Sequence, residues 1–239
     1  MTTRTNCFVR RKIDTLAVIP ARGGSKGIPK KNLAVLGGVS LLGRAIQFAE
    51  ESDLFDGILV STDDVEIATE AGRYGHQPDF LRSPLASGDR ASASDLINDV
   101  LQTLANNEVD VRRLVLLEPT SPMRTKKSVV EALRLTDSGY DAAITVSPVD
   151  VKYHPDKQFY LDANGLATFF TKRGQSVVAR QELDVTYIRN GFAYAVMVEA
   201  FRRLGGIYET RLAAVVCSEP FVNIDTESDL KQCRQFFEC

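Results

Sequence analysis

The sequence predicts an α/β fold: a three-layer α/β/α sandwich around a mostly parallel sheet, with a small hairpin-rich insertion. Two observations predict it. Short apolar runs rich in β-branched residues recur along the chain, and because they are continuously apolar they are typical of strands buried on both faces of a parallel sheet. Amphipathic segments with helical spacing lie between these runs, and strands that alternate with helices form a parallel sheet covered on both sides.

The predicted elements follow one another in regular order. The strands are residues 15–19, 58–60, 114–117, 142–146 and 213–217. The helices are residues 40–49, 63–74, 92–104, 126–136 and 226–237. The first helix has the clearest pattern, because Ser40 is a suitable N-cap and Leu42, Ile46 and Ala49 fall on one face.

Residues 149–189 break this alternation. The turn sequence Asp-Ala-Asn-Gly at 162–165 separates short aromatic pieces at 159–160 and 169–170, which predicts hairpins rather than another strand and helix. We therefore expect residues 1–239 to form a single domain, with 149–189 as an insertion that covers a site or makes a dimer contact.

Composition limits the possible partners and the chemistry. The 29 Lys and Arg against 31 Asp and Glu give a net charge of −2, which argues against nucleic acid or an anionic membrane as partner. No apolar run approaches the ~20 residues of a membrane span, and the first residues lack a signal peptide's apolar stretch, so we expect a cytoplasmic protein. The four cysteines are scattered and only two histidines are present, which argues against disulfides, a zinc site or a His-based triad.

A basic loop at residues 20–32 is the strongest functional signal. The first predicted strand runs directly into a segment that contains three glycines, one arginine and three lysines. Glycines allow the backbone to approach a ligand closely, and the cations neutralise a polyanion at the edge where α/β sheets bind ligands. The Walker pattern and the dinucleotide pattern GxGxxG are both absent. The loop therefore predicts a triphosphate site of another class.

Several ordered motifs resemble those of one family. The segment ARGGSKGIPKKN at 21–32 resembles the signature of the CMP-N-acylneuraminate cytidylyltransferases (CMP-sialic acid synthetases), which couple CTP and a nonulosonic acid into a CMP-sugar. Further similar blocks lie at 41–43, 58–63, 81–87, 116–124, 180–183, 190–191 and 223–226, so the likeness covers nearly the whole chain. The resemblance implies a Rossmann-like nucleotidyltransferase that uses CTP, an acidic sugar and Mg²⁺ and forms a homodimer, with residues 149–189 in the dimerisation and sugar-binding contacts.

The resemblance also implies roles for individual residues. Those that would bind the nucleotide are Ala21, Arg22, Gly23, Ser25, Lys26, Lys31, Asn32 and Arg82. Those that would bind the sugar are Glu118, Thr120, Ser121, Lys157, Arg180, Gln181 and Asn190. The catalytic residues would be Arg22, Lys26, Lys31 and Asp225, with Asp225 and Asn223 as metal ligands. Alternation in an extended segment places residues 223 and 225 on the same side.

Two positions depart from the family pattern. Glu118 stands where the family has Gln, and Asn223 stands where it has Asp. Glu118 places an anion near the expected acidic sugar, which leaves open another acid sugar of the legionaminic or pseudaminic type, a phosphonate acceptor, or GTP as the donor. Asn223 leaves open a nucleotide-binding regulator without catalysis. The Kdo cytidylyltransferases fit less well, because their first loop differs.

Overall fold

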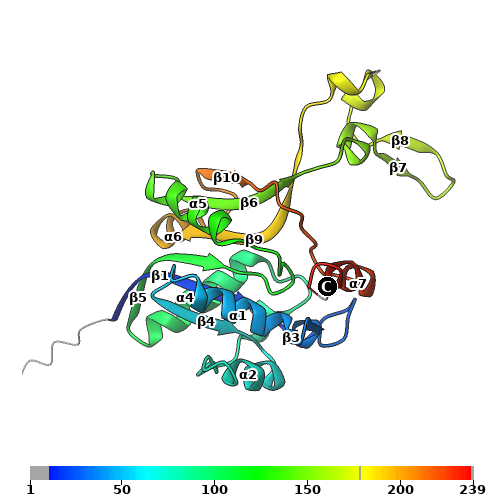
Figure 1. Cartoon of the computed structure of the whole chain (residues 1–239). Helices are drawn as coiled ribbons and strands as arrows, with labels where there is room; N and C mark the ends of the chain where they lie inside the picture. The colour runs from blue at the N-terminus through cyan, green and yellow to red at the C-terminus, as the bar shows by residue number, and fades with distance from the viewer. Residues whose placement is uncertain (1–10, 178, 238–239) are drawn as a thin grey trace, which may run out of the picture.

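The computed structural model describes residues 11–177 and 179–237, so Cys7 and Cys239 lie outside the described residues. Six strands form the central sheet in the order β10-β6-β9-β5-β1-β4 (Figure 1). Their bounds are β1 Arg11–Pro20, β4 Gly57–Ser61, β5 Val109–Leu116, β6 Ala142–Pro148, β9 Tyr187–Met197 and β10 Leu212–Val216. The predicted mostly parallel α/β sheet is confirmed, and each of the five predicted strands lies in it.

Strand β9 is the element that the sequence pattern did not predict. It lies between β5 and β6 and pairs antiparallel with both. Its central residues, Phe192 to Val196, are at most 6% exposed. The chain enters β9 directly from the insertion, without a helix, so the strand–helix alternation gave it no place. Because β9 begins at Tyr187, the last residues of the predicted insertion belong to the sheet.

Helices cover both faces of the sheet, which makes the three predicted layers. On one face lie α1 (Leu41–Glu51), α2 (Val65–Gly72) and α5 (Lys126–Asp137). On the other lie α4 (Ala93–Asn106) and α6 (Val198–Leu204). The Ser40 side chain accepts a hydrogen bond from the Gly43 amide at 3.0 Å, as expected of an N-cap. No helix of the described residues is long and apolar enough to cross a membrane.

A small hydrophobic cluster, separate from the two that lie on the faces of the sheet, supports the basic loop. Ile28 of the loop packs with Ile224 and with Leu230 of α7 (Glu227–Arg234), next to the hairpin β2 (Val35–Leu36) and β3 (Val39–Ser40). Gly27 lies so close to the extended chain before α7 that an added Cβ would fall 2.1 Å from the Asp225 carbonyl oxygen. Glycine is therefore required there, and the loop is packed against the chain that carries residues 223–225.

The insertion forms an arm (described residues 149–177 and 179–186) that extends away from the sheet and its helices (Figure 1). It contains the hairpin β7 (Phe159–Leu161) and β8 (Ala167–Phe169). Its turn uses Asp162, whose Oδ1 accepts from the Asn164 amide at 2.9 Å. The remaining short elements of the chain are α3 Pro84–Ser87 and the 3₁₀ helices η1 Lys31–Leu33, η2 Val151–Tyr153, η3 Pro155–Lys157, η4 Arg173–Gln175 and η5 Arg180–Glu182.

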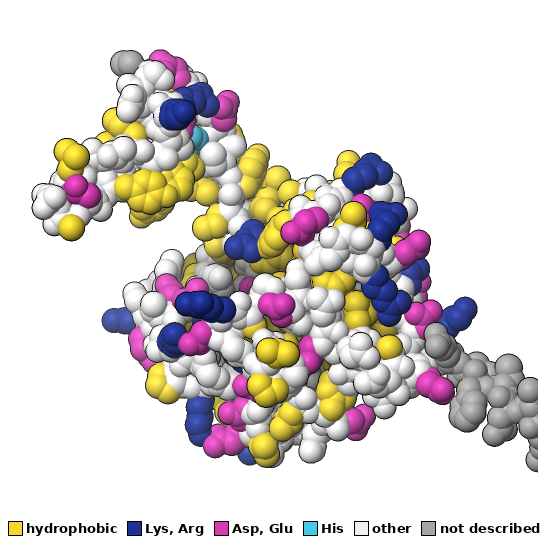
Figure 2. Space-filling view, turned by 180° about the vertical axis from the view of Figure 1, so that it is seen from behind, with side chains coloured by type: hydrophobic (Ala, Val, Ile, Leu, Met, Phe, Trp, Pro, Cys, Tyr) yellow, Lys and Arg dark blue, Asp and Glu magenta, His cyan; other side chains and the backbone are white. Residues whose placement is uncertain are grey.

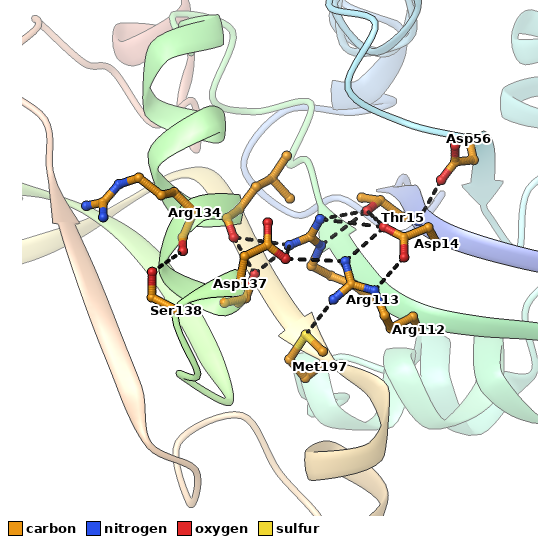
Figure 3. Close-up of polar contacts among 11 residues, drawn as sticks. Asp14, Thr15, Asp56, Arg112, Arg113, Arg134, Asp137, Ser138 and Met197 are labelled. Carbon is orange, nitrogen blue, oxygen red and sulfur yellow. Dashed lines mark hydrogen bonds and ion pairs between the residues drawn. The ribbon is translucent and has the colours of Figure 1, made fainter.

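At the edge of the sheet where β1 and β5 begin, charged side chains form a closed network (Figure 3). Arg113 of β5 is 4% exposed and donates to Thr15 Oγ1 at 2.9 Å and to Asp137 Oδ1 at 2.9 Å. Arg112 pairs with Asp14 and Asp137. We call these residues, Asp14, Thr15, Arg112, Arg113 and Asp137, the amino-edge network.

Candidate active site

A cavity of about 530 Å³ lies at the opposite, carboxyl edge of the sheet, where β1 and β5 end. Its wall comes from three segments that are distant in sequence: the basic loop after β1, the loop after β5 and the extended chain before α7. Ten of the predicted site residues line it: Arg22, Ser25, Lys26, Lys31, Asn32, Arg82, Glu118, Thr120, Asn223 and Asp225. The structure therefore brings most of the predicted nucleotide and metal residues together with part of the predicted sugar site.

The cations of the basic loop face the cavity and are held by exposed carboxylates. Lys26 Nζ lies 2.7 Å from Asp89 Oδ2, and Arg22 Nη1 lies 3.3 Å from Asp89 Oδ1. Lys31 Nζ lies 2.7 Å from Asp225 Oδ1. The hydrogen bond from Lys26 lowers the pKa of Asp89, so this carboxylate is charged over the whole physiological range. Sequence analysis missed Asp89, which approaches the loop only through the tertiary fold.

The backbone of the loop is anchored to the end of β4. The Gly23 amide donates to Asp63 Oδ1 at 2.9 Å, and the Ala21 amide donates to the Ser61 carbonyl at 2.9 Å. Neither Ala21 nor Gly23 lines the cavity. Their amides therefore hold the loop in place. Asp63 is a second residue that sequence analysis missed, although it lies directly after a predicted strand.

Two further predicted residues, Asn32 and Arg82, line the same cavity. Asn32 is buried, and its Nδ2 donates to the Arg22 carbonyl at 3.0 Å. Arg82 is 8% exposed, and its Nε donates to Ser61 Oγ at 3.0 Å. Burial lowers the pKa of Arg82, and the nearby Asp63 opposes that shift, so the guanidinium stays protonated. Both predicted residues thus line the cavity from rigid positions.

Glu118 lies at the other end of the cavity. Burial raises the pKa of its carboxyl, while the charges of Arg124 and Arg189 act in the opposite direction. A Cβ on Gly191 would fall 2.4 Å from Glu118 Oε2 and 2.3 Å from Ser121 Oγ, and Gly191 has a φ of +71°. Only glycine meets both demands at once. β9 therefore approaches Glu118 more closely than any other residue type would allow.

Three of the residues around Glu118 have their polar groups engaged inside the protein. Asn190 is fully buried, and its amide donates to Ser147 Oγ at 3.0 Å and accepts from the Phe192 amide at 3.2 Å. Ser121 is fully buried, and its hydroxyl donates to Asn223 Oδ1 at 3.4 Å. Arg124 donates to the carbonyls of Glu118 and Phe192, and burial lowers its pKa to about 10. The predicted sugar contacts of Ser121 and Asn190 stay predictions.

The segment before α7 alternates as predicted. Val222 and Ile224 are buried, whereas Asn223 and Asp225 line the cavity. Their amide and carboxylate oxygens are the ligand type that Mg²⁺ prefers. Among the residues that the structure describes, no three His, Cys, Asp or Glu side chains gather into a metal-binding group.

The residues predicted on the arm lie elsewhere. Lys157, Arg180 and Gln181 are exposed, and none of them lines the cavity. Within one chain, the structure does not bring them to the cavity.

Comparisons with known proteins agree with this geometry. The family model described as cytidylyltransferase matches residues 16–238. An N-acylneuraminate cytidylyltransferase of Streptococcus agalactiae is 31% identical over 228 residues, which are 90% of this chain and 51% of that protein. The chain thus spans about half the length of that relative. A pseudaminic acid cytidylyltransferase of Campylobacter jejuni is 30% identical over 220 residues, with 90% of this chain and 93% of that protein covered.

A solved structure extends the likeness to the fold. The CMP:2-keto-3-deoxy-manno-octonic acid synthetase complexed with CTP superposes with a TM-score of 0.68, covers 94% of this chain and 98% of its own, and is 18% identical. At that identity the match bears on the fold alone. The family match, in contrast, spans nearly every described residue and includes each segment of the cavity wall. The chain therefore belongs to the cytidylyltransferase family.

Proposed function

We propose that this chain transfers the cytidylyl group of CTP to the anomeric hydroxyl of a nonulosonic acid, which yields a CMP-sugar and pyrophosphate. One observation carries the proposal: a single cavity joins the cations of the basic loop to Glu118, Thr120, Asn223 and Asp225. Relatives named for N-acylneuraminate, legionaminic acid and pseudaminic acid support the same class of acceptor.

The residues of the cavity fit an in-line displacement at the α-phosphorus. Arg22 and Lys26 would exchange Asp89 for the triphosphate and spread the charge that builds on the leaving pyrophosphate. The acceptor hydroxyl forms the new bond to the α-phosphorus, the bond to the β-phosphate oxygen breaks, and the hydroxyl gives up its proton. Because positioning and charge supply the catalysis, no covalent enzyme intermediate is needed.

Mg²⁺ fits the oxygen donors present and belongs to the same proposal. Asp225 and Asn223 would hold it, and Lys31, 2.7 Å from Asp225, would shift toward the phosphates. When bound, the ion supplies positive charge to the phosphate oxygens.

The arm supports a homodimer. Exposed apolar side chains gather on the arm (Figure 2), and they include Phe159, Tyr160, Leu161, Leu166 and Phe170, which are 47–70% exposed. An apolar surface of this kind is typical of an interface, and a second copy of the chain would cover it. Analytical ultracentrifugation should give a dimer, and Tyr160→Asp should shift it toward monomer. The cytoplasmic location expected from the sequence is part of the same proposal, and cell fractionation tests it.

Pyrophosphate release tests the reaction. CTP and GTP are each supplied with N-acetylneuraminic, legionaminic and pseudaminic acid, and we expect turnover with CTP and at least one acid. Asp225→Ala should lower the rate at least about 100-fold. Glu227→Gln is the matched control, since Glu227 is exposed nearby but does not line the cavity. CTP binding without turnover for any acceptor would instead favour a non-catalytic regulator, and full activity of Asp225→Ala would refute the metal assignment.

A further inference from the structure

The turn at the end of the hairpin of the arm has no part in the function proposed above. It joins β7 to β8 through residues 162–166, all of which are exposed. Asn164 in this turn is followed directly by glycine, and in the whole sequence only Asn190 shares that arrangement. Asparagine is a thermolabile residue type, and a following glycine leaves the backbone nitrogen without a shielding side chain. The turn therefore holds an amide that the next residue can attack.

The Asn164 side chain is free to move. In the part of the chain that the structure describes, its backbone amide donates to Asp162 Oδ1 at 2.9 Å, but no hydrogen bond involves its side-chain amide. Gly165 has a φ of +82°, and beyond its chain neighbours no atom lies within 4 Å of the position of an added Cβ. The space around this peptide bond is open, so the Asn164 side chain and the Gly165 nitrogen can approach each other.

The second asparagine–glycine pair is enclosed. Asn190 is fully buried, its Nδ2 donates to Ser147 Oγ at 3.0 Å, and its Oδ1 accepts from the Phe192 amide at 3.2 Å. An added Cβ on Gly191 would fall 2.3 Å from Ser121 Oγ, so the space beside that residue is filled. Asn190 can react only after both hydrogen bonds break and the sheet opens around it. The two pairs have the same residue types, so the fold decides which one reacts.

We propose that Asn164 is a site of spontaneous deamidation in the folded protein and that the fold protects Asn190. The Gly165 nitrogen loses its proton and forms a bond to Asn164 Cγ. The bond from Cγ to Nδ2 breaks, and the amide nitrogen takes up a proton and leaves as ammonia. Water then opens the cyclic imide at either carbonyl carbon. The product at position 164 is an aspartate or an isoaspartate, with one water consumed and one ammonia released.

Asp162 controls how easily the turn reacts. Its Oδ1 accepts from the amides of Asn164 and Leu166 at 2.9 and 2.8 Å, and its carbonyl accepts from the Gly165 amide at 3.0 Å. These bonds hold the attacking nitrogen in place, so the reaction requires the turn to open. An exposed turn opens at little cost in free energy, whereas opening a buried strand costs much more. Asp162→Ala should therefore speed the reaction, and Asp162→Asn, which keeps an oxygen acceptor, should leave its rate close to that of wild type.

The reaction changes the arm in charge and in length. It adds a negative charge next to that of Asp162, and an isoaspartate lengthens the main chain by one methylene group at the turn. The register of the hairpin pairs Phe159 with Phe169 and brings their ring centres to 4.3 Å. The modified residue thus lies in the element that carries exposed apolar side chains of the arm.

The test follows both asparagines in the whole protein by peptide mass spectrometry during incubation at mildly alkaline pH. A deamidated peptide is heavier by the difference between a hydroxyl and an amino group. In the folded protein, Asn164 should react at least about 30-fold faster than Asn190. In concentrated guanidinium chloride the two rates should be similar, because the fold no longer protects Asn190. The Asn164 rate should rise with pH, since the attacking nitrogen must lose its proton.

Two results with the unmodified chain would overturn the proposal. One is a similar rate for Asn164 and Asn190 in the folded protein. The other is an Asn164 that stays intact in the folded protein while both asparagines react in guanidinium chloride. A rate at Asn164 that Asp162→Ala leaves unchanged would refute the control by Asp162. The outcome does not depend on the proposed reaction, because no substrate is added and no turnover is measured.

Discussion

The two edges of the central sheet gather the same residue types for opposite purposes. At the amino edge, Arg113 is buried and donates to Thr15, Thr136, Asp137 and the Leu133 carbonyl at 2.8–3.1 Å (Figure 3). At the carboxyl edge, Lys26 is 77% exposed and its carboxylate partner Asp89 is 53% exposed.

The buried charges of the amino edge are suited to stabilising the fold, whereas the exposed charges of the carboxyl edge are free to exchange partners. A buried guanidinium with several fixed acceptors loses much when any of them is removed. An exposed ion pair contributes only about 0–1 kcal/mol, so a polyanionic ligand displaces its carboxylate readily. Stability should therefore depend on the amino edge, and substrate binding on the carboxyl edge.

Removing the buried arginine should have the largest effect. Arg113→Met leaves the hydroxyl oxygens of Thr15 and Thr136 without the donor that Arg113 supplies, and we expect a loss of about 3 kcal/mol in the free energy of unfolding. This corresponds to a fall in Tm of about 6–12 °C for a chain of this size. Thermal unfolding measures it. Below the transition, the kcat/KM of the variant should match wild type.

Arg112→Met is the control for that change, because Arg112 is 41% exposed and pairs with exposed carboxylates. It should cost less than about 1 kcal/mol. Equal losses of unfolding free energy in the two variants would contradict the distinction between the buried Arg113 and the exposed Arg112.

For the basic loop we expect a loss of activity with little change in stability. Lys26→Met should lower kcat/KM for CTP about 30-fold, since the variant loses a cation that spreads charge on the phosphates. Its Tm should stay within about 2 °C of wild type. Lys30→Met is the matched control: Lys30 is in the same loop and forms an ion pair with Glu66, but it does not line the cavity. A similar loss of activity in both variants would show that the loop acts through its overall charge.

Contiguous motifs explain what the sequence could predict. The basic loop and the segment 223–226 carry their functional residues next to one another, and the strands before them have an apolar signature. Residues that act through the tertiary fold carry no such signal. Asp63 contacts Gly23 across 40 residues, and Asp89 contacts Arg22 across 67. Each looks like an ordinary surface acid in the sequence.

The start of β9 explains the remaining misses. A strand without a preceding helix does not fit the alternation, so the segment around Arg189 was not placed at the sheet edge. Asn190 stands in the same segment, next to the irregular pairing of β6 and β9 between Ile144 and Val146. Its buried amide satisfies the backbone at that irregularity, a role that no local pattern indicates.

A smaller effect tests whether Asp89 occupies the place of the nucleotide phosphates. Asp89→Asn removes the charge that competes for Arg22 and Lys26, so CTP should bind about threefold more tightly. Isothermal titration calorimetry measures the Kd, and the gain should shrink at high salt, because exposed charges are screened. Weaker CTP binding by the variant would mean that Asp89 assists the bound nucleotide.

The smallest effect concerns the partly buried carboxyl of Glu118 in the cavity wall. Burial raises the pKa of Glu118 in the folded protein, so the folded state holds this proton more tightly than the unfolded chain does. Stability must therefore fall as the pH rises from the ordinary glutamate pKa of about 4.3 through the raised value. Glu118→Gln removes that dependence, and its Tm should exceed that of wild type slightly at pH 8 and match it near about pH 4. Arg124 and Arg189 oppose the effect of burial, which keeps the gain small. A lower Tm at pH 8 would mean that these cations outweigh burial, and that Glu118, like Asp137 at the amino edge, stabilises the fold through its charge.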